Sequence, residues 1–265
     1  MRYERTGYYD ENINVQCVYG DKNIEHIMKC IIPNLAMTTK KNIFFLTMNY
    51  KKHGKRIASG KMHNITVVDI EKDENRPTGF AENHNILFEH FTKTSSFVLM
   101  NPDCIPLPQS IDCLLNRKTD EVAIVEGRQW PFEHPKEYDP LSLETPWASG
   151  AFALIDSCFY EKVNGMDPLY FLYNEDVDLS WRAWLNGYRV LYEPSAQIIH
   201  FTNGYFENKT ILSTEKYFSL RNFILISRKF FGKEGEYKAI EMLRTSIEKN
   251  IFNLILNDYN NNIVN

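Results

Sequence analysis

Apolar residues in the first half of the chain fall into short runs, and segments with helical spacing separate these runs. The runs predict strands at residues 14–19, 42–48, 65–70, 96–100 and 122–125. The spacing of apolar residues between them predicts helices at residues 23–35, 78–91 and 106–115. Strands that alternate with helices are typical of an α/β fold with a mostly parallel, doubly wound sheet. Ligands of such sheets bind beyond the carboxyl ends of the strands.

The second half combines a turn of small residues, a helix that begins with acidic residues, and an extended segment that ends in histidine. The predicted elements are a turn at 148–151, a strand at 152–155, helices at 157–163 and 176–186, and a broken extended segment at 189–199. Asn174 is the expected N-cap of the second helix, and Gly187 is its expected end. Glu175 and Asp176 therefore lie at the positive end of the helix dipole, which favours their ionised forms.

Two segments lack this α/β pattern. Residues 126–146 are rich in proline and charge and show no periodicity, which predicts a loop over the ligand site. Beyond His200, the spacing of apolar residues predicts two helices, at 213–231 and 238–256. We therefore expect an α/β domain over residues 1–204 and a C-terminal helical extension over residues 205–265.

The composition of the 265-residue chain is that of an ordinary globular protein, with 43% hydrophobic and 24% charged residues. The net charge of −4 argues against a nucleic-acid partner, which would require a basic surface. Five scattered cysteines without a CxxC pair predict free thiols rather than a zinc ribbon or a disulfide framework. No run reaches the roughly 18 apolar residues of a membrane span, and no apolar leader is visible, so we expect a cytoplasmic protein.

A few acidic and histidine positions carry the candidate chemistry. Asp103 follows a fully apolar strand, and its carboxylate is a hard oxygen ligand suited to Mg²⁺ or Mn²⁺. The Asn-Pro-Asp sequence that contains it also makes an ordinary turn. His200 either ligates a metal or ends a strand with its hydrogen bonds satisfied. Glu175 and Asp176 have two explanations, since a carboxylate at the start of a helix can cap that helix or can act as a general base.

These motifs occur in an order that resembles the second half of inverting family 2 glycosyltransferases of the GT-A fold, in the bacterial rhamnosyltransferase-like branch. The residues that match the family's motifs are Gly79, Phe80, Ala81, Asn85, Gly150, Ala151, Phe152, 171–179, Arg182, Gly187, Tyr188, Arg189, Tyr192, Pro194 and His200. The resemblance is weak before Gly79, where the base- and ribose-binding residues of the family are not recognisable. The identity of the nucleotide therefore stays open.

The resemblance implies roles for individual residues. It makes Asp176 the general base, with Glu175 beside it as the second member of the catalytic pair. It makes Asp103 and His200 the protein ligands of a Mn²⁺ or Mg²⁺ cofactor. The residues implied in binding the donor are Gly79, Asn85, Asn101, Trp147, Ser149, Gly150 and Arg182. Asn101 stands where the family often has an aspartate, which removes one charged ligand.

The implied activity is inverting transfer of a sugar from a nucleotide-diphosphate donor, dTDP- or UDP-linked, to a hydroxyl acceptor in bacterial surface-polysaccharide or glycan synthesis. The implied partners are the nucleotide sugar and a glycan or lipid-linked glycan acceptor, and no nucleic acid is expected. The C-terminal helices would pack against the domain, rest on the inner face of the membrane, or support a homodimer.

Other functions fit part of the pattern. A nucleotide-sugar-binding protein without transfer activity would explain the weak match before Gly79 and the asparagine at position 101. A dinucleotide-binding oxidoreductase would share the sheet, but no GxGxxG motif occurs among the 12 glycines. A nucleotidyltransferase would carry a glycine-rich basic signature near the N-terminus, which is absent. At single residues, core packing explains Trp147 equally well, and a surface ion pair with Asp178 explains Arg182.

Overall fold

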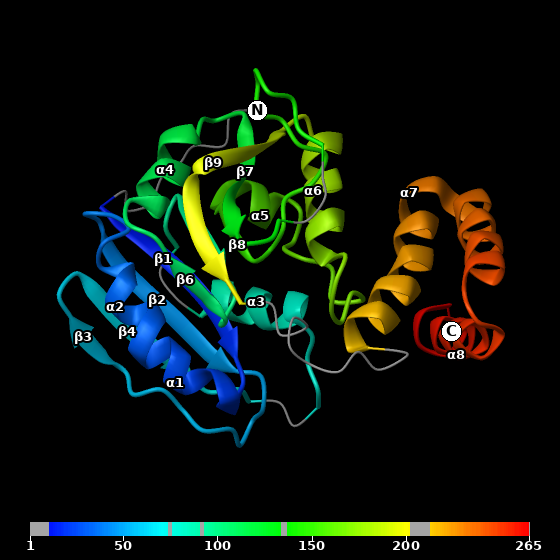
Figure 1. The fold of residues 1–265 in the computed structure, drawn as a ribbon, viewed down its shortest axis with the longest axis horizontal. Helices are drawn as coiled ribbons and strands as arrows, with labels where there is room; N and C mark the ends of the chain where they lie inside the picture. The colour runs from blue at the N-terminus through cyan, green and yellow to red at the C-terminus, as the bar shows by residue number, and fades with distance from the viewer. Residues whose placement is uncertain (1–10, 74–75, 91–92, 134–136, 202–212, 265) are drawn as a thin grey trace.

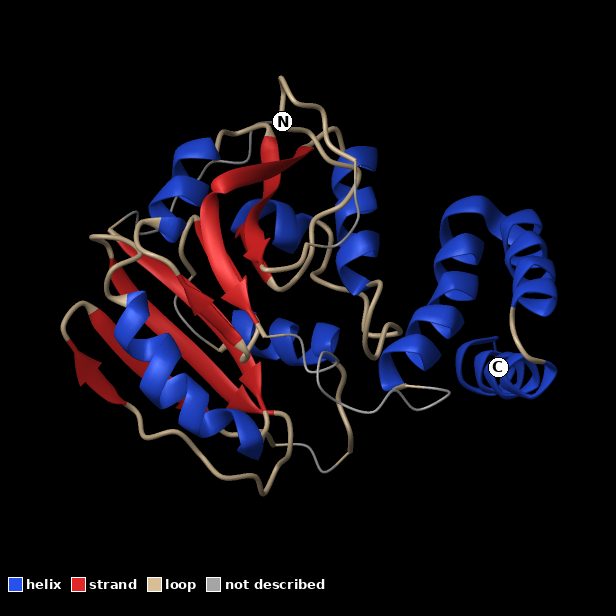
Figure 2. Ribbon diagram, in the orientation of Figure 1, coloured by secondary structure: helices blue, strands red, loops and turns tan. Residues whose placement is uncertain are grey.

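A nine-stranded sheet forms the centre of the protein, with helices on both of its faces and a pair of helices beside it (Figure 1 and Figure 2). The computed structural model describes residues 11–73, 76–90, 93–133, 137–201 and 213–264. In chain order the strands are β1 (Asn12–Tyr19), β2 (Asn42–Asn49), β3 (Gly60–Met62), β4 (Ile65–Ile70), β5 (Ser96–Met100), β6 (Cys104–Pro106), β7 (Val122–Trp130), β8 (Phe152–Asp156) and β9 (Arg189–His200).

The sheet is mixed, with the strand order β3-β4-β2-β1-β5-β8-β7-β9-β6. Strands β1, β2, β4 and β5 are parallel to one another, β8 is antiparallel to both β5 and β7, and β9 is parallel to β7. The short edge strands β3 and β6 run antiparallel to β4 and β9. Six of the nine strands therefore share one direction, which confirms the predicted α/β fold with a mostly parallel sheet.

Helices cover both faces of this sheet. In chain order the helices of the chain are the helical stretch η1 (Asp21–Asn23), α1 (Ile24–His26), η2 (Ile27–Ile31) and α2 (Ile32–Leu35), then α3 (Phe80–Glu89), α4 (Ser110–Arg117), α5 (Ser157–Lys162), α6 (Glu175–Leu185), α7 (Thr214–Ser246), α8 (Lys249–Tyr259) and η3 (Asn260–Val264). Apolar side chains of α1, η2, α2 and α4 pack on one face of the sheet. Those of α3, α5 and α6 pack on the other face.

The C-terminal helices α7 and α8 pack against each other beside the sheet, as Figure 1 shows, and α7 contacts α6 where the rings of Phe230 and Phe231 meet that of Trp181. Their apolar cluster joins Ile224 and Ile255 to Val177 and Trp181 of α6. The predicted boundary between residues 204 and 205 lies outside the described residues, so the two-part division stays a prediction, but apolar contacts connect its two sides. Among the described helices, none combines the length and the apolar composition that crossing a bilayer requires.

Strands β7 and β9 differ from their predicted lengths. β7 runs to Trp130 instead of ending at residue 125, because β9 pairs with it over its whole length. The segment expected to be a loop from residue 126 therefore begins with strand. The predicted break in the 189–199 segment is a bulge within one continuous strand, where the partner of β7 shifts from Glu193 to Gln197.

Short edge strands and some helix boundaries were not predicted from the sequence. β3 and β6 have three residues each, which is too short for a recognisable period. The helix expected from residue 106 begins at Ser110, since the residues up to Pro106 belong to β6. In the C-terminal region α7 continues to Ser246 through a kink at Gly232, so the helix predicted at 238–256 is divided between α7 and α8.

Candidate active site

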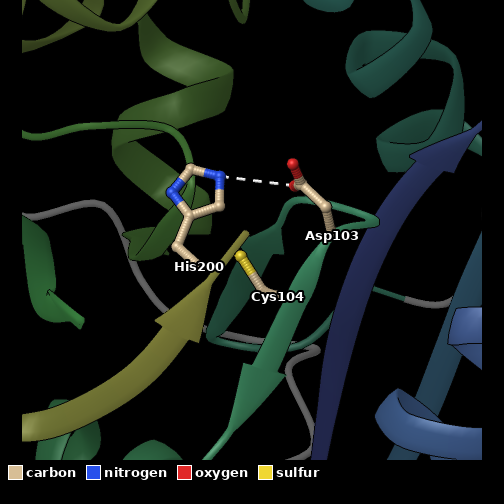
Figure 3. Close-up of side chains that lie close together, drawn as sticks. All are labelled: Asp103, Cys104 and His200. Atoms are coloured by element: carbon tan, nitrogen blue, oxygen red, sulfur yellow. Dashed lines mark ion pairs between the residues drawn. The ribbon is translucent and has the colours of Figure 1, made fainter. Parts of the chain in front are cut away.

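Asp103 and His200 face each other where two strand ends pair. β5 ends at Met100, and the turn that follows places Asp103 directly before β6. β6 runs antiparallel to the end of β9, with Cys104 opposite His200. The His200 Nε2 atom lies 3.3 Å from Asp103 Oδ1, and the two side chains point toward each other (Figure 3). The structure thus brings together the two residues predicted to ligate a metal.

The side chain of Gln129 fixes the orientation of the His200 ring. Its Oε1 atom lies 2.7 Å from His200 Nδ1, and its Nε2 donates to Glu126 Oε1 at 3.4 Å. Because the amide nitrogen of Gln129 is directed at Glu126, its oxygen accepts from His200, which assigns the proton to Nδ1. The other ring nitrogen, Nε2, then faces Asp103. Gln129 was not predicted, because it lies in the segment expected to be a loop, and only its pairing with β9 reveals it.

This donor set fits a hard divalent cation. The ligand atoms of Asp103, Cys104 and His200 all lie within 4.8 Å of one another. Burial raises the pKa of the Cys104 thiol well above its ordinary value, and the negative charge of Asp103 raises it further. The thiol therefore keeps its proton, which leaves the carboxylate oxygen and the imidazole nitrogen as ligands. Two ligand atoms about 2.1 Å from one cation lie about 3 Å apart at right angles, close to the observed 3.3 Å.

Backbone N–H groups hold the carboxylate of Asp176. The N–H of Gly150 donates to Oδ2 at 3.1 Å, and the N–H of Val177 donates to Oδ1 at 2.8 Å. A Cβ atom at position 150 would lie 3.3 Å from the Phe80 ring and 3.8 Å from the Asp176 Cβ, so the small residue permits this close approach. Gly150 and Asp176, which the sequence analysis assigned to the donor pocket and to the base, are direct neighbours.

The turn at 148–151 connects the Asp176 region to the Asp103 turn. The Ser180 hydroxyl accepts from the Ala148 N–H at 3.0 Å and donates to the Asp176 carbonyl at 2.7 Å. On the other side, the N–H of Asn101 donates to the carbonyl of Ala151 at 2.9 Å. Ser149 in the middle of this turn is buried. Asn101, Ser149 and Gly150 therefore lie between the two groups of candidate catalytic side chains.

Glu175 differs from Asp176 in its environment. Its side chain is buried, and its Oε2 atom has no hydrogen-bond partner among the described residues. Burial raises the pKa of Glu175 well above its ordinary value of 4.5, and the negative charge of Asp176 raises it further. The environment of Glu175 therefore favours the neutral form of its carboxyl group more than that of a solvent-exposed glutamate does. The helix dipole favours ionisation, as expected from the sequence, but the loss of water outweighs it at this position.

A left-handed turn precedes these two acids. Tyr173 and Asn174 have φ angles of 68° and 69°, a left-handed conformation that asparagine tolerates but that is strained for Tyr173. Asn174 occupies the predicted N-cap position, but its side chain makes no capping hydrogen bond. Burial raises the pKa of the Tyr173 hydroxyl to about 12, with further contributions from the charges of Glu215, Glu175 and Asp103. The Tyr173 ring thus lies within electrostatic reach of both candidate groups.

Gly79 and Asn85, two residues predicted to bind the donor, make their described contacts with the fold. A Cβ atom at Gly79 would lie 2.0 Å from the Phe171 carbonyl oxygen, so glycine lets α3 begin against the segment before α6. The Asn85 amide donates to the Met166 carbonyl at 2.8 Å and accepts from the Met166 N–H at 3.0 Å. Their roles in donor binding stay predictions, and their observed roles are in packing.

Arg182 and Trp147 also contact the fold. The Arg182 Nε donates to Asp178 Oδ2 at 2.7 Å, and its Nη1 donates to the carbonyls of Val163 and Gly165. The ion pair that was the alternative explanation of Arg182 is therefore present, but it lies in the interior instead of at the surface, because Asp178 is fully buried. Arg182 also connects α6 to the turn after α5. Trp147 is half-buried at the start of the 148–151 turn.

The carboxyl ends of β1, β2 and β4 hold a second polar cluster, centred on Asp69. Its Oδ1 atom accepts from the Tyr19 hydroxyl at 2.9 Å and from the Thr47 hydroxyl at 2.7 Å, and Arg56 Nε donates to Oδ2 at 2.8 Å. Arg56 also pairs with Glu71 at 2.9 Å. The Asp69 side chain is buried and Arg56 is 45% exposed, so the arginine covers the solvent side of this cluster.

Two curated relatives each match about a quarter of the chain. The sequence is 38% identical over 69 residues to rhamnosyltransferase WbbL of Escherichia coli (strain K12), a match that covers 26% of this chain and 26% of that protein. It is 37% identical over 62 residues to N-acetylglucosaminyl-diphospho-decaprenol L-rhamnosyltransferase of Mycobacterium tuberculosis (strain CDC 1551 / Oshkosh), covering 23% and 20%. The likeness to rhamnosyltransferases thus spans about a quarter or less of each protein. No family model matches the chain.

Solved structures resemble the whole fold. The mannosyltransferase PcManGT from Pyrobaculum calidifontis, in complex with GDP-Man and Mn²⁺, aligns with a TM-score of 0.57 and 12% identity over 97% of this chain and 82% of that one. S. aureus TarS 1–349 in complex with UDP-GlcNAc aligns with a TM-score of 0.52 and 11% identity over 94% and 72%. These alignments show that the chain has the GT-A fold of glycosyltransferases, as the motif order predicted.

Proposed function

We propose that this protein is a rhamnosyltransferase-like, inverting glycosyltransferase that moves a sugar from a nucleotide-diphosphate donor to a hydroxyl group. The observation that carries the proposal is the carboxylate of Asp176, held by the N–H groups of Gly150 and Val177 at 3.1 and 2.8 Å within a GT-A fold. The partial likeness to two rhamnosyltransferases supports the same class of reaction.

In this proposal Asp176 acts as the general base. Its carboxylate takes the proton of the acceptor hydroxyl while that oxygen bonds to the anomeric carbon of the donor sugar. The bond between the anomeric carbon and the diphosphate oxygen breaks on the opposite face, so the configuration inverts. The two N–H groups orient the carboxylate of Asp176 and favour its charged form, whereas burial raises the pKa of Glu175 and favours its neutral form.

Asp103 and His200 would hold the cofactor, Mn²⁺ or Mg²⁺, whose positive charge stabilises the departing diphosphate. Gln129 would support metal binding, because its hydrogen bond fixes the His200 ring with Nε2 directed at Asp103. Asn101 adds an uncharged side chain at the same turn, so the protein supplies one carboxylate there. We propose a dTDP- or UDP-linked sugar as the donor.

The acceptor in this proposal is a glycan, free or lipid-linked. The Mycobacterium tuberculosis relative is named for a decaprenol-linked acceptor, which supports the lipid-linked form. Transfer to a lipid-linked acceptor by this protein would take place at the inner face of the membrane, with peripheral contact through α7 and α8. That contact, a cytoplasmic location and a homodimer through these helices stay predictions from the sequence.

The test compares Asp176→Asn with a matched control, Asp112→Asn, which changes an acidic residue in the first turn of α4. We expect thermal stabilisation of all three proteins by one of UDP, dTDP, GDP or CMP, and a larger effect with Mn²⁺. We expect acceptor-dependent release of nucleotide diphosphate by the wild type and the control, and turnover at least about 100-fold lower in Asp176→Asn.

Two results would contradict the proposal in different ways. Nucleotide binding by the wild type without any acceptor-dependent turnover would indicate a nucleotide-sugar-binding protein without transfer activity. Turnover of Asp176→Asn close to that of Asp112→Asn would leave the reaction class intact and remove Asp176 as the base.

A further inference from the structure

The segment at 167–174 connects α5 to α6 and leads directly into Glu175 and Asp176. Its last two residues, Tyr173 and Asn174, both have left-handed backbone conformations, with φ angles of 68° and 69°. Strained conformations of this kind persist only where the surrounding structure holds them. The contacts of this segment therefore decide where the helix, and with it the Asp176 carboxylate, begins.

Asn222 of α7 holds the strained turn through two hydrogen bonds. Its Nδ2 donates to the carbonyl of Leu172 at 2.9 Å and to the carbonyl of Tyr173 at 2.6 Å. The Asn222 side chain is fully buried. The Oδ1 atom accepts from Arg221 Nε at 2.9 Å and from Arg221 Nη2 at 2.8 Å, which fixes the amide with its nitrogen toward the turn. Both N–H bonds of this one amide group are therefore used on the backbone that precedes Glu175.

Further contacts of α7 hold the rest of the segment. Arg221 Nη2 donates to the Leu169 carbonyl at 3.2 Å. The Phe218 and Phe171 rings stack with their centroids 5.2 Å apart. Lys229 Nζ lies 2.7 Å from Asp167 and 2.6 Å from Asp178 of α6. These side chains contact the segment along its length, from its first residue into the helix that follows it.

The opposite side of the segment rests on the start of α3. The N–H of Phe80 donates to the Phe171 carbonyl at 2.8 Å, and the absence of a side chain at Gly79 allows this approach. Phe80 also lies against Gly150, whose N–H holds Asp176. The segment is thus enclosed between α3 and α7, and a shift of α7 would be transmitted to the turn that carries the acids.

We propose that Asn222 is a positioning residue for the transfer reaction and that α7 is therefore part of the active site. Asn222 acts through the Leu172 and Tyr173 carbonyls, which hold the left-handed turn and thereby set the position of Asp176 relative to the Gly150 N–H and the acceptor hydroxyl. The inference rests on the proposed function, since it assigns the positioning to the residue named there as the base. It predicts an effect on the chemical step and little effect on binding of the donor.

The test compares Asn222→Ala with Asn64→Ala. Asn64 is a matched control, because its Nδ2 also donates to two backbone carbonyls, those of Thr39 at 3.1 Å and Lys41 at 2.9 Å, on the far side of the sheet. We expect kcat to fall about 10- to 100-fold in Asn222→Ala, with the donor KM and the nucleotide Kd within about 3-fold of the wild type. Asn64→Ala should keep the wild-type kcat.

A second variant and a second measurement separate positioning from loss of the fold. Asn222→Asp keeps the shape of the side chain and replaces its two N–H donors, so we expect the same fall in kcat at unchanged nucleotide affinity. Hydrogen exchange of the Val177 and Asp178 amides should be faster in both Asn222 variants than in Asn64→Ala, because these amides bond within the turn and the first helical residues.

The outcomes are distinguishable from those of the proposed function. A wild type without turnover would contradict the proposed function, and the exchange rates alone would then show whether Asn222 holds the turn. An active wild type with equal kcat in Asn222→Ala and Asn64→Ala would overturn the positioning role. A rise in donor KM that accounts for the whole loss of kcat/KM would overturn it as well, because the defect would then lie in binding.

Discussion

At the scale of the residue, Glu175 and Asp176 show how neighbours in the sequence acquire different chemistry. Asp176 receives two backbone N–H bonds, whereas Glu175 Oε2 is buried without a partner among the described residues. Hydrogen bonds to a carboxylate favour its charged form, and burial favours the neutral form. These environments favour the charged form of Asp176, which its proposed role as the base requires, and the neutral form of Glu175.

Gln129→Leu tests the hydrogen bond that orients His200. Loss of the 2.7 Å contact frees the imidazole to rotate, so we expect the affinity for Mn²⁺ to fall about 10- to 100-fold. Calorimetric titration of the purified protein with MnCl₂ measures this change. Gln197→Leu is the control. Gln197 lies on β9, as His200 does, but its side chain donates to the Pro194 carbonyl at 3.2 Å and not to the His200 ring. Equal affinities of the two variants would show that the ring is held by other contacts.

At the scale of the element, the segment at 167–174 is placed by helices that are distant from it in the sequence. α3 contacts it through the start of the helix at Gly79 and Phe80, and α7 contacts it through Phe218 and Asn222. Neither helix contains a residue proposed to take part in the chemical step. Their contribution is the placement of backbone, which ordinary helix and strand periodicity does not describe.

Gly79→Ala tests this packing at the α3 side. The new Cβ atom would lie 2.0 Å from the Phe171 carbonyl oxygen, and backbone on both sides must move to relieve the contact. We expect the free energy of unfolding, measured by urea denaturation, to fall by about 2 kcal/mol. Gly60→Ala is the control, since no atom lies within 4 Å of a Cβ atom there. A loss of stability as large in Gly60→Ala would point to a general cost of replacing glycine.

At the scale of the whole molecule, a buried histidine between α3 and β1 contributes to the pH dependence of stability. The Nδ1 atom of His84 lies 3.0 Å from Gln16 Oε1. Burial lowers the pKa of His84 from 6.5 to about 3. The folded state therefore keeps the ring neutral at pH values where the unfolded chain binds a proton. The stability linked to this ring is complete above pH 6.5 and is lost as the pH falls toward 3.

His84→Gln should remove this dependence. We expect the variant to lose less stability than the wild type between pH 6.5 and about pH 3, with a difference of at most about 5 kcal/mol. Urea denaturation at a series of pH values measures the slope. His90→Gln, an exposed position at the end of the same helix, is the control and should keep the wild-type slope. An unchanged slope in His84→Gln would place the acid sensitivity in other groups.

The sequence by itself determined the class of fold and the order of the candidate groups. Apolar runs and helical spacing depend on residues that are close in the chain, so β1, β2, β4, β5 and α6 were predicted near their observed positions. Asp103, Asp176 and His200 each lie at the start or just at the end of such an element, and the resemblance in motif order favoured their candidate roles over their explanations as turn, cap and strand-end residues. The resemblance in motif order pointed to the GT-A fold, which the solved structures then showed.

Only the tertiary structure decided how these groups act together. The pairing of β6 with β9 brings Asp103 opposite His200, and the extension of β7 brings Gln129 behind the ring. Burial, which depends on every element packed around a residue, raises the pKa of Glu175 and so favours its neutral form. Asn222 reaches the turn before the acids from about 50 residues further along the chain. Contacts between residues this far apart in the chain produce no periodic pattern in the sequence, because they depend on how the elements pack in three dimensions.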